Sequence, residues 1–344
     1  MRVLLIVTVT IFSASLIYIV NNLYDHSWDV KKVWKAGFDE KQISINGSTL
    51  NYVKGPDNGP ALLLLHGQVA SWENYARVLP ALSKEFHVYA VDYYGHGGSG
   101  HDPGKYSMSK TGKDLARFID EVIQEPVIVS GHSTGGLLTA WLAANSAVHI
   151  RGVILEDPPF FSSEFPKVKK TFLYTDLSVL CHQFLHSKEK DFTAYYVKHN
   201  VWMPFFQGWE RAIRNYGLNY RQKHPDKPLV YFFLPPSVNL MFHGLERYDP
   251  RFGDTFYDGS WNDSNHADIL KRIKVPSVLI HTNWLYDPNG ILLGSMDEND
   301  ASRAHKLIAD NKLIRVHTGH GFHFEKPKEF IKILLEFKKQ VETK

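Results

Sequence analysis

The chain has 344 residues, more than one ordinary domain and fewer than three, and its 44% hydrophobic and 22% charged residues are typical of a globular protein. A formal net charge of +3 gives no strong basic field, which argues against nucleic acid as a partner. The single cysteine, Cys181, excludes an intrachain disulfide and a cysteine metal cluster, and we expect it to be a small buried hydrophobe. The sequence has no H-E-x-x-H pattern, so we expect neither a metal nor a cofactor.

The first segment of the chain is an uncharged apolar run, Val3–Val20. As a helix it reaches about 27 Å, close to the roughly 30 Å of a bilayer's hydrocarbon core. The run is longer than the core of a secretion signal, and no A-x-A cleavage site follows it. We therefore predict that residues 1–22 form an uncleaved signal-anchor, an N-terminal transmembrane helix. A cleaved secretion signal and a buried helix of the soluble domain are the alternatives.

A membrane is thus an expected partner, but the orientation of the span is contested. Arg2 and the amino terminus are positive on one side, and Lys31, Lys32 and Lys35 follow on the other. A short charged N-terminus before one span most often stays in the cytoplasm. We therefore expect a membrane-anchored protein whose main domain lies outside the cytoplasm.

After this segment, short apolar runs alternate with helical patterns. Two runs around Asn46-Gly47 predict a hairpin, because this dipeptide favours a tight turn between strands. The predicted strands are Gln42–Ile45, Thr49–Val53, Ala61–Leu65, Phe86–Val91, Pro126–Ser130, Arg151–Glu156, Val275–His281 and Lys312–His317, and the predicted helices are Trp72–Lys84, Asp114–Ile123, Thr134–Ala144 and Pro327–Val341. Strands separated by helices of this length predict βαβ units and a mostly parallel sheet in an α/β fold.

The alternation stops at Pro158 and resumes after Arg272. In this middle segment 24 of 115 residues are aromatic, against 22 of the other 229, which is too many for a solvated loop. We predict that residues 158–272 form a mainly helical lid, inserted after the sixth strand between two parts of one core, 40–157 and 273–344. About half of its aromatic residues should build the lid's own small core. The rest should line an apolar pocket for a small apolar ligand.

The strongest chemical motif is Gly131-His132-Ser133-Thr134-Gly135, which fits the G-x-S-x-G pattern of a nucleophile elbow. Its flanking positions must be nearly free of side chains, because a tight turn between strand and helix exposes the serine hydroxyl. An apolar strand pattern precedes the motif and an apolar helix pattern follows it. This context favours Ser133 as a nucleophile over a Gly-Ser loop.

Two further loops follow strands of the first half. His66-Gly67-Gln68 can bring the backbone N–H of Gln68 to the same point as that of Thr134, and two such donors form an oxyanion hole. We expect the His66 ring to brace this loop. The glycine-rich segment 92–99 lacks the spacing of a phosphate-binding loop, so we interpret it as a structural turn.

A serine hydroxyl needs a general base, and the segment 318–327 (TGHGFHFEKP) offers two histidines after a predicted strand. His320 lies nearer the strand end, between glycines that allow a sharp turn. His323 lies closer to the next helix, where we expect it to pack or to form hydrogen bonds. We therefore predict that His320 is the base.

The base in turn needs a carboxylate to fix its tautomer. Asp287 follows the predicted strand Val275–His281 and keeps the chain order Ser, Asp, His, so we predict that it has this role. Asp157, at the end of Arg151–Glu156, fits the same order and is the rival. Asp297 and Asp300 are possible but lie further from the strand.

Together these motifs resemble the α/β-hydrolase superfamily, in particular its capped, esterase-like serine hydrolases. The matching pieces are LLLLHGQ, VDYYGHGGSG, VIVSGHSTGG, RGVILEDPP, KVPSVLIH and GHGFHFEKPKEF, and they cover the chain from about Leu50 to Val341, excepting the lid. The resemblance implies the base role for His320 and the oxyanion role for Gln68. One departure concerns the acid, because the glycine usual after strand seven is missing and the loop before Asp287 is longer.

The resemblance implies an eight-stranded α/β-hydrolase sheet flanked by helices, and a Ser133, His320, Asp287 triad acting through an acyl-enzyme on an apolar carboxylic ester. Family members that open epoxides or displace halide are similar in fold but have aspartate at the elbow. The alternatives are other acyl chemistry on the same triad (thioester or amide cleavage, acyl transfer, perhydrolysis) and a non-catalytic binding protein on this scaffold.

Overall fold

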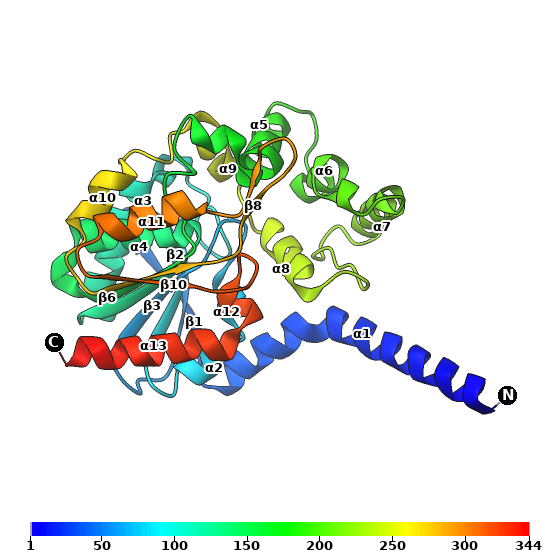
Figure 1. The fold of residues 1–344 in the computed structure, drawn as a ribbon, viewed down its shortest axis with the longest axis horizontal. Coiled ribbons are helices and arrows are strands. Elements are labelled where there is room, and N and C mark those ends of the chain that lie inside the picture. The colour runs from blue at the N-terminus through cyan, green and yellow to red at the C-terminus, as the bar shows by residue number, and fades with distance from the viewer. Residues whose placement is uncertain (1, 344) are drawn as a thin grey trace.

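The computed structural model describes residues 2–343, with side chains from residue 12 onward except that of Ala147. An eight-stranded sheet forms its centre, in the order β1-β2-β4-β3-β5-β6-β7-β10 (Figure 1). The strands are β1 (Asp39–Ile45), β2 (Ser48–Lys54), β3 (Ala61–Leu65), β4 (His87–Asp92), β5 (Val127–His132), β6 (Ile150–Glu156), β7 (Ser277–His281) and β10 (Asn311–Arg315). Every pairing is parallel except the two made by β2, so the predicted mostly parallel sheet is confirmed.

The first two strands form the predicted hairpin. Asn46 and Gly47 connect them with φ angles of 49° and 82°. Positive φ at both central residues is the conformation of a type I′ turn, which Asn-Gly adopts readily. The dipeptide thus explains both the turn and the register, in which Ile45 pairs with Ser48.

Helices cover both faces of the sheet, so its central strands are buried on two sides. In β3, Leu63 and Leu65 belong to one hydrophobic cluster while Leu62 and Leu64 belong to another, as the alternation of a strand requires. Figure 1 shows α3 (Met108–Phe118), α4 (Thr134–Asn145) and α11 (Glu298–Leu307) on one face, and α2 (Leu79–Leu82) and α13 (Pro327–Glu342) on the other. The shorter pieces of the core are η1 (Trp72–Tyr75), η2 (Pro103–Lys105), η3 (Ile119–Ile123), η4 (Ala147–His149) and α12 (Phe322–Glu325).

Several parts of the core differ from the sequence prediction, among them the helix predicted over Asp114–Ile123, which begins at Met108. The helix predicted over Trp72–Lys84 is divided into η1 and α2, because Pro80 near the start of α2 has no N–H to continue the preceding turn. A two-stranded hairpin of β8 (Leu285–Tyr286) and β9 (Leu292–Leu293) follows β7. Helix α11 follows that hairpin.

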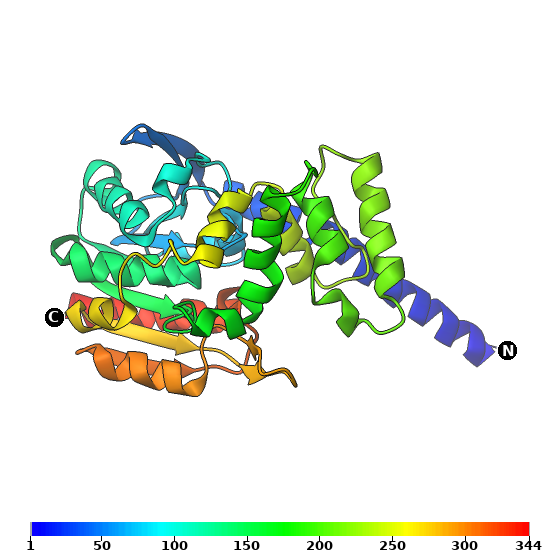
Figure 2. The ribbon, with the colours of Figure 1, turned by 90° about the horizontal axis from the view of Figure 1, so that it is seen from above.

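The chain between β6 and β7 forms the lid, and all its named elements are helical. They are η5 (Lys167–Lys170), η6 (Leu173–Ser178), α5 (Val179–Leu185), α6 (Phe192–His199), η7 (Met203–Phe205), α7 (Glu210–Lys223), α8 (Pro236–Leu245), α9 (Pro250–Asp258) and α10 (His266–Arg272). Figure 2 shows α6, α7 and α8 gathered at one end of the molecule, with α10 lying back along the core.

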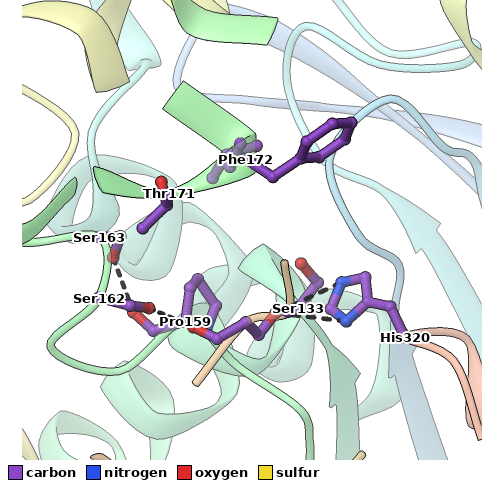
Figure 3. Close-up of a pocket in the computed structure, with 10 residues that line it drawn as sticks. Ser133, Pro159, Ser162, Ser163, Thr171, Phe172 and His320 are labelled. Atoms are coloured by element: carbon purple, nitrogen blue, oxygen red, sulfur yellow. Dashed lines mark hydrogen bonds between the residues drawn. The ribbon is translucent and has the colours of Figure 1, made fainter. Parts of the chain in front are cut away.

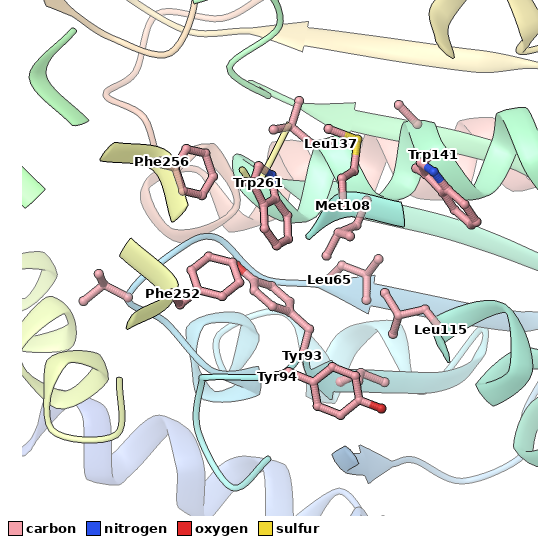
Figure 4. Packing of buried hydrophobic residues seen from close by; sticks show 14 of the residues in the cluster. Leu65, Tyr93, Tyr94, Met108, Leu115, Leu137, Trp141, Phe252, Phe256 and Trp261 are labelled. Carbon is pink, nitrogen blue, oxygen red and sulfur yellow. The ribbon is translucent and has the colours of Figure 1, made fainter. Parts of the chain in front are cut away.

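An aromatic cluster joins the lid to the core. Phe252 of α9 lies 5.7 Å from Tyr93, measured between ring centroids, and 4.7 Å from Trp261. Figure 4 shows these rings packed beside Leu65 of β3 and Leu137 of α4. Part of the lid's aromatic content therefore anchors it to the sheet.

The N-terminal segment forms one helix, α1 (Arg2–Lys35), which extends away from the core beneath the lid (Figure 1). Within the described part of the chain, none of the helices combines the length and the apolar character that a membrane crossing requires. The predicted transmembrane helix is therefore not supported. Met1 and the side chains of residues 2–11, on which that prediction also drew, lie outside what the structure describes.

Candidate active site

Ser133 occupies a strained turn between β5 and α4. Its φ of 55° and ψ of −123° lie in a region that side chains rarely adopt. The flanking glycines are required by space: a Cβ on Gly131 would lie 2.2 Å from the carbonyl oxygen of Gly135, and a Cβ on Gly135 would lie 2.2 Å from the carbonyl oxygen of Leu65. This geometry is that of a nucleophile elbow.

The loop after β3 lies directly against this serine. A Cβ on Gly67 would lie 3.2 Å from Cβ of Ser133, so the backbone next to Gln68 reaches the elbow. Thr134 is the first residue of α4, where backbone N–H groups have no acceptor within the helix. The two expected oxyanion donors thus come from segments that meet at Ser133, and their role stays a prediction.

His66 braces the loop, as expected from the sequence. Its Nδ1 lies 2.7 Å from the carbonyl oxygen of Gly67, and its ring stacks on Tyr93 at 4.4 Å. Burial lowers the pKa of His66 to about 4, although its hydrogen bond to Gly67 opposes the shift. The ring is therefore neutral near pH 7 and structural.

The carboxylate partner of His320 is Asp157. Nδ1 of His320 lies 2.7 Å from Oδ2 of Asp157, and because a carboxylate only accepts, the ring donates its Nδ1 proton there. Asp157 is fully buried after β6 and is held by Thr282 of the loop after β7, whose Oγ1 donates to Oδ2 at 2.6 Å. Nε2 is then left to exchange protons with a nucleophile.

The prediction that Asp287 pairs with His320 is wrong. Asp287 lies in the β8–β9 turn, where its Oδ1 accepts the backbone N–H groups of Asn289 and Ile291, both at 2.8 Å. The hairpin that follows β7 takes this side chain away from His320. The other two candidates serve elsewhere, because Lys167 pairs with Asp297 at 2.9 Å and with Asp300 at 2.6 Å.

The His320 side chain remains 42% exposed and lines a cavity together with Ser133 (Figure 3). Among the hydrogen bonds of residues 2–343, none joins the Ser133 hydroxyl to this ring, the contact that a serine nucleophile and its base would make. Catalytic hydrogen bonds are often long in proteins without substrate. Desolvation lowers the pKa of His320, but the hydrogen bond and charge of Asp157 together raise it above its ordinary value.

The second histidine of the loop has the structural role expected for it. His323 is buried, its Nδ1 lies 2.8 Å from Oε1 of Glu156, and its Nε2 lies 2.7 Å from Oδ1 of Asn74. Burial raises the pKa of Glu156, but the charge and hydrogen bonds of His323 outweigh this and lower it overall. Nε2 of His132 also lies 2.9 Å from the carbonyl oxygen of His320, so both histidines fasten the loop that carries His320.

Two cavities meet at Ser133 and His320. The larger, of about 380 Å³, lies under the lid; its lining residues are Gln68, Val69, Ser133, Phe172, Leu173, Asp176, Leu177, Tyr196, Trp202, Ser237, Val238, Met241, Leu245 and His320. The smaller, of about 270 Å³, is lined by Ser133, Pro159, Ser162, Ser163, Thr171, Phe172, Leu173, Gly294, Ser295 and His320. Several lid aromatics therefore do line the site.

Asp176 is an ionisable group in the larger cavity and is engaged by the lid itself. It accepts a hydrogen bond from the Tyr196 hydroxyl and another from the backbone N–H of Val201 at 2.8 Å. Burial raises the pKa of Asp176 to about 6 although these hydrogen bonds lower it. Cys181 is buried as expected, and burial raises the pKa of its thiol well above the ordinary value.

Sequence reasoning missed Thr282 and Ser295. Ser295 Oγ lies 3.2 Å from Nδ1 of His320 and 3.5 Å from Nε2. No motif surrounds either residue, so a sequence signal for them is absent. Both residues lie in the segment between β7 and α11, and only the path of this segment in the structure brings them to Asp157 and His320.

The model of the alpha/beta hydrolase family matches residues 62–333. Bifunctional epoxide hydrolase 2 of Mus musculus is 24% identical over 308 residues, which are 85% of this chain and 53% of that protein. Fluoroacetate dehalogenase of a Burkholderia species is 34% identical over 105 residues, 29% of this chain and 34% of that protein. The matches thus span about half or less of the length of these relatives.

Solved structures share the fold across most or all of the chain. A membrane phospholipase A described as a bacterial virulence factor has a TM-score of 0.65 at 19% identity, covering 100% of this chain and 99% of its own. An esterase of a Rhodococcus species has a TM-score of 0.61 at 20% identity, covering 88% and 99%. At these identities the likeness concerns the fold alone.

Proposed function

This chain belongs to the alpha/beta hydrolase family, and on that premise we propose that it is a serine hydrolase that cleaves apolar carboxylic esters through an acyl-enzyme. The observation that supports the proposal is that Ser133, on a strained elbow, lines two cavities together with His320, whose ring pairs with Asp157. A serine, a histidine and a buried carboxylate that accepts a hydrogen bond from the histidine are the parts of a nucleophilic triad.

In the proposed reaction Ser133 Oγ attacks the acyl carbon and its proton passes to Nε2 of His320. The carbonyl electron pair moves to oxygen, where the N–H groups of Gln68 and Thr134 stabilise the negative charge. When the bond from carbon to the leaving alcohol breaks, its electron pair goes to the alcohol oxygen and Nε2 returns the proton. Water then attacks the acyl-Ser133 ester in the same way, which releases the acid and restores the serine.

The linings support an apolar, neutral acyl group. Val238, Met241 and Leu245, all from α8, face the larger cavity, and its buried carboxyl, Asp176, is already bonded to the lid. A charged acyl group would lose its hydration there without gaining a partner of opposite charge. A volume of about 380 Å³ accommodates an acyl chain longer than acetyl.

A fluorophosphonate probe and a series of p-nitrophenyl esters test the proposal together. We expect the probe to label the protein, and Ser133→Ala to abolish labelling and to lower kcat by several orders of magnitude. The matched control is Ser237→Ala, which removes a hydroxyl from the larger cavity and should keep labelling. Activity should rise from acetyl to hexanoyl esters. Labelling or near-normal turnover in a well-folded Ser133→Ala protein would contradict the proposal.

A further inference from the structure

Ser295 stands beside the base in a position that the reaction above does not use. Its hydroxyl oxygen lies 3.2 Å from Nδ1 and 3.5 Å from Nε2 of His320, so it is close to both ring nitrogens. Figure 3 shows the ring of His320 beside Ser133, with dashed lines at its two nitrogens. The same hydroxyl borders the smaller cavity.

The backbone around Ser295 is held on both sides. Gly294 has a φ of 153°, and a Cβ there would lie 2.8 Å from Cβ of Trp284. The Ser162 hydroxyl donates to the carbonyl oxygen of Ser295, and Nε2 of His281 lies 3.1 Å from the carbonyl oxygen of Met296. The hydroxyl therefore sits at a defined place and not on a free loop end.

The position of the protons on His320 decides to which group the Ser295 hydroxyl can donate a hydrogen bond. Nδ1 gives its hydrogen to Asp157 at 2.7 Å, the shorter of its two contacts, so Nε2 is the atom that carries the transferred proton. An oxygen hydrogen-bonded to Nε2 lies about 3 Å from it. Because Ser295 Oγ is 3.5 Å from Nε2, such an oxygen also comes within hydrogen-bond distance of Ser295 when it lies on the side of Nε2 that faces Ser295.

We propose, building on the proposed esterase function, that Ser295 donates a hydrogen bond to the leaving-group oxygen and that the smaller cavity holds the alcohol half of the substrate. As the carbon–oxygen bond breaks, the electron pair collects on the alcohol oxygen. His320 Nε2 transfers its proton to that oxygen, while Ser295 keeps its own proton and stabilises the developing charge. Ser295 is thereby a catalytic residue for poor leaving groups.

The lining of the smaller cavity defines the alcohol. It combines apolar surface from Pro159, Phe172 and Leu173 with hydroxyls of Ser162, Ser163 and Thr171, and its lining residues bring it no formal charge beyond that which His320 can carry. A neutral aliphatic alcohol fits this surface, whereas a phosphorylated or carboxylated alcohol finds no cation besides the base. The volume, about 270 Å³, suits a small alcohol.

The test compares two leaving groups on one acyl chain, ethyl hexanoate and p-nitrophenyl hexanoate, through kcat/KM. Ethoxide needs protonation and a hydrogen bond as it leaves, whereas p-nitrophenolate leaves without them. For Ser295→Ala we expect the ratio of kcat/KM for the ethyl ester to that for the p-nitrophenyl ester to fall about tenfold to a hundredfold. Ser295→Thr, which keeps a hydroxyl, should restore most of the ratio.

The control is Ser302→Ala on α11, whose hydroxyl donates to Glu298 at 2.8 Å and which should leave the ratio unchanged. An unchanged ratio in Ser295→Ala, or an equal loss with both esters, would overturn the proposal, because a merely structural role affects both substrates alike. Failure of the esterase function is distinguishable: the unaltered protein would then hydrolyse neither ester, and both proposals would fall.

Discussion

Asp157 combines two properties that a triad acid needs, burial and a fixed orientation. It adopts a φ of 45°, which aspartate tolerates better than most residues, immediately after β6. Its backbone N–H donates to the carbonyl oxygen of Ile280 at 2.8 Å, and Thr282 donates to its carboxylate. The loop after β7 therefore supports the acid instead of supplying it.

Replacement of each carboxylate should show whether Asp157 or Asp287, the residue predicted from the sequence, supports kcat. Asp157→Asn removes the acceptor that fixes the His320 tautomer, and we expect kcat to fall by about 10³ to 10⁴. Asp287→Asn changes a turn residue outside the site and should keep kcat within about threefold. Steady-state kinetics of both variants with one ester decide the assignment. Equal losses, or a larger loss in Asp287→Asn, would contradict it.

The pH dependence of kcat/KM should report the pKa of His320. The pairing with Asp157 raises this pKa above 6.5, and only the neutral ring can accept the Ser133 proton. Activity is therefore expected to be lost as the pH falls through an apparent pKa above 6.5, and Asp157→Asn should move that pKa downward. A midpoint below 6.5 in the unaltered protein, measured between pH 5 and 9 at constant ionic strength, would disagree with the pairing.

Much of this site follows from residues whose chemistry and spacing are visible in the sequence. Ser133 and His320 line the same cavities because loops after parallel strands meet at one edge of the sheet. The acid was misplaced because two carboxylates satisfied the same chain order. Only the β8–β9 hairpin, which turns Asp287 away from His320, shows which of the two carboxylates pairs with it. The sequence does not predict this hairpin, because two-residue strands are too short to give a periodic pattern.

At the scale of elements, the elbow depends on how closely α4 approaches β3. A methyl group on Gly135 would lie 2.2 Å from the carbonyl oxygen of Leu65 and 2.4 Å from that of His66, and neither backbone atom can move without shifting the strand end. We expect Gly135→Ala to cost about 1–3 kcal/mol or more in unfolding free energy. Thermal unfolding measures the effect.

Gly100→Ala is the matched control for this experiment. A Cβ there would lie 3.4 Å from the backbone nitrogen of Thr49, an ordinary contact, so its melting temperature should stay near that of the unaltered protein. If Gly135→Ala melted at the same temperature as this control, the close packing of helix and strand at the elbow would not be a constraint.

The elements that the sequence predicts well are those with a strong periodic pattern. The strand Ala61–Leu65 and the helix over Thr134–Ala144 agree with β3 and α4 to within a residue. The polar part of α1 was missed because Asn22, Asp25 and Asp29 interrupt the apolar pattern. Each of these residues has a partner distant in the chain, which a local pattern cannot reveal.

At the scale of the whole molecule, α1 connects the lid with the segment that follows His320. Nδ2 of Asn22 donates to the carbonyl oxygens of Phe232 and Leu234 in the lid, at 3.1 and 2.8 Å. One turn further, Asp25 pairs with Arg77, whose Nη1 donates at 3.1 Å to the carbonyl oxygen of Phe324. The helix thereby links the lid, on one side of the cavities, with the segment after His320, on the other.

The contacts of Asn22 predict an effect on substrate binding from a residue outside the cavities. Its backbone carbonyl accepts from Asn239 of α8 at 3.3 Å, and α8 also supplies Val238 and Met241 to the larger cavity. Asn22→Ala leaves one buried and one partly buried lid carbonyl without their donor, at a cost of about 1–3 kcal/mol. We expect a lower melting temperature and a KM for hexanoyl esters raised severalfold, with kcat nearly unchanged because Ser133 and His320 stay in place.

Tyr18→Phe is the control, since this hydroxyl makes one exposed contact at 3.5 Å with the carbonyl oxygen of Phe233 and should leave KM as it is. If KM in Asn22→Ala equalled that of the control while the melting temperature fell, α1 would stabilise the fold without shaping the lid.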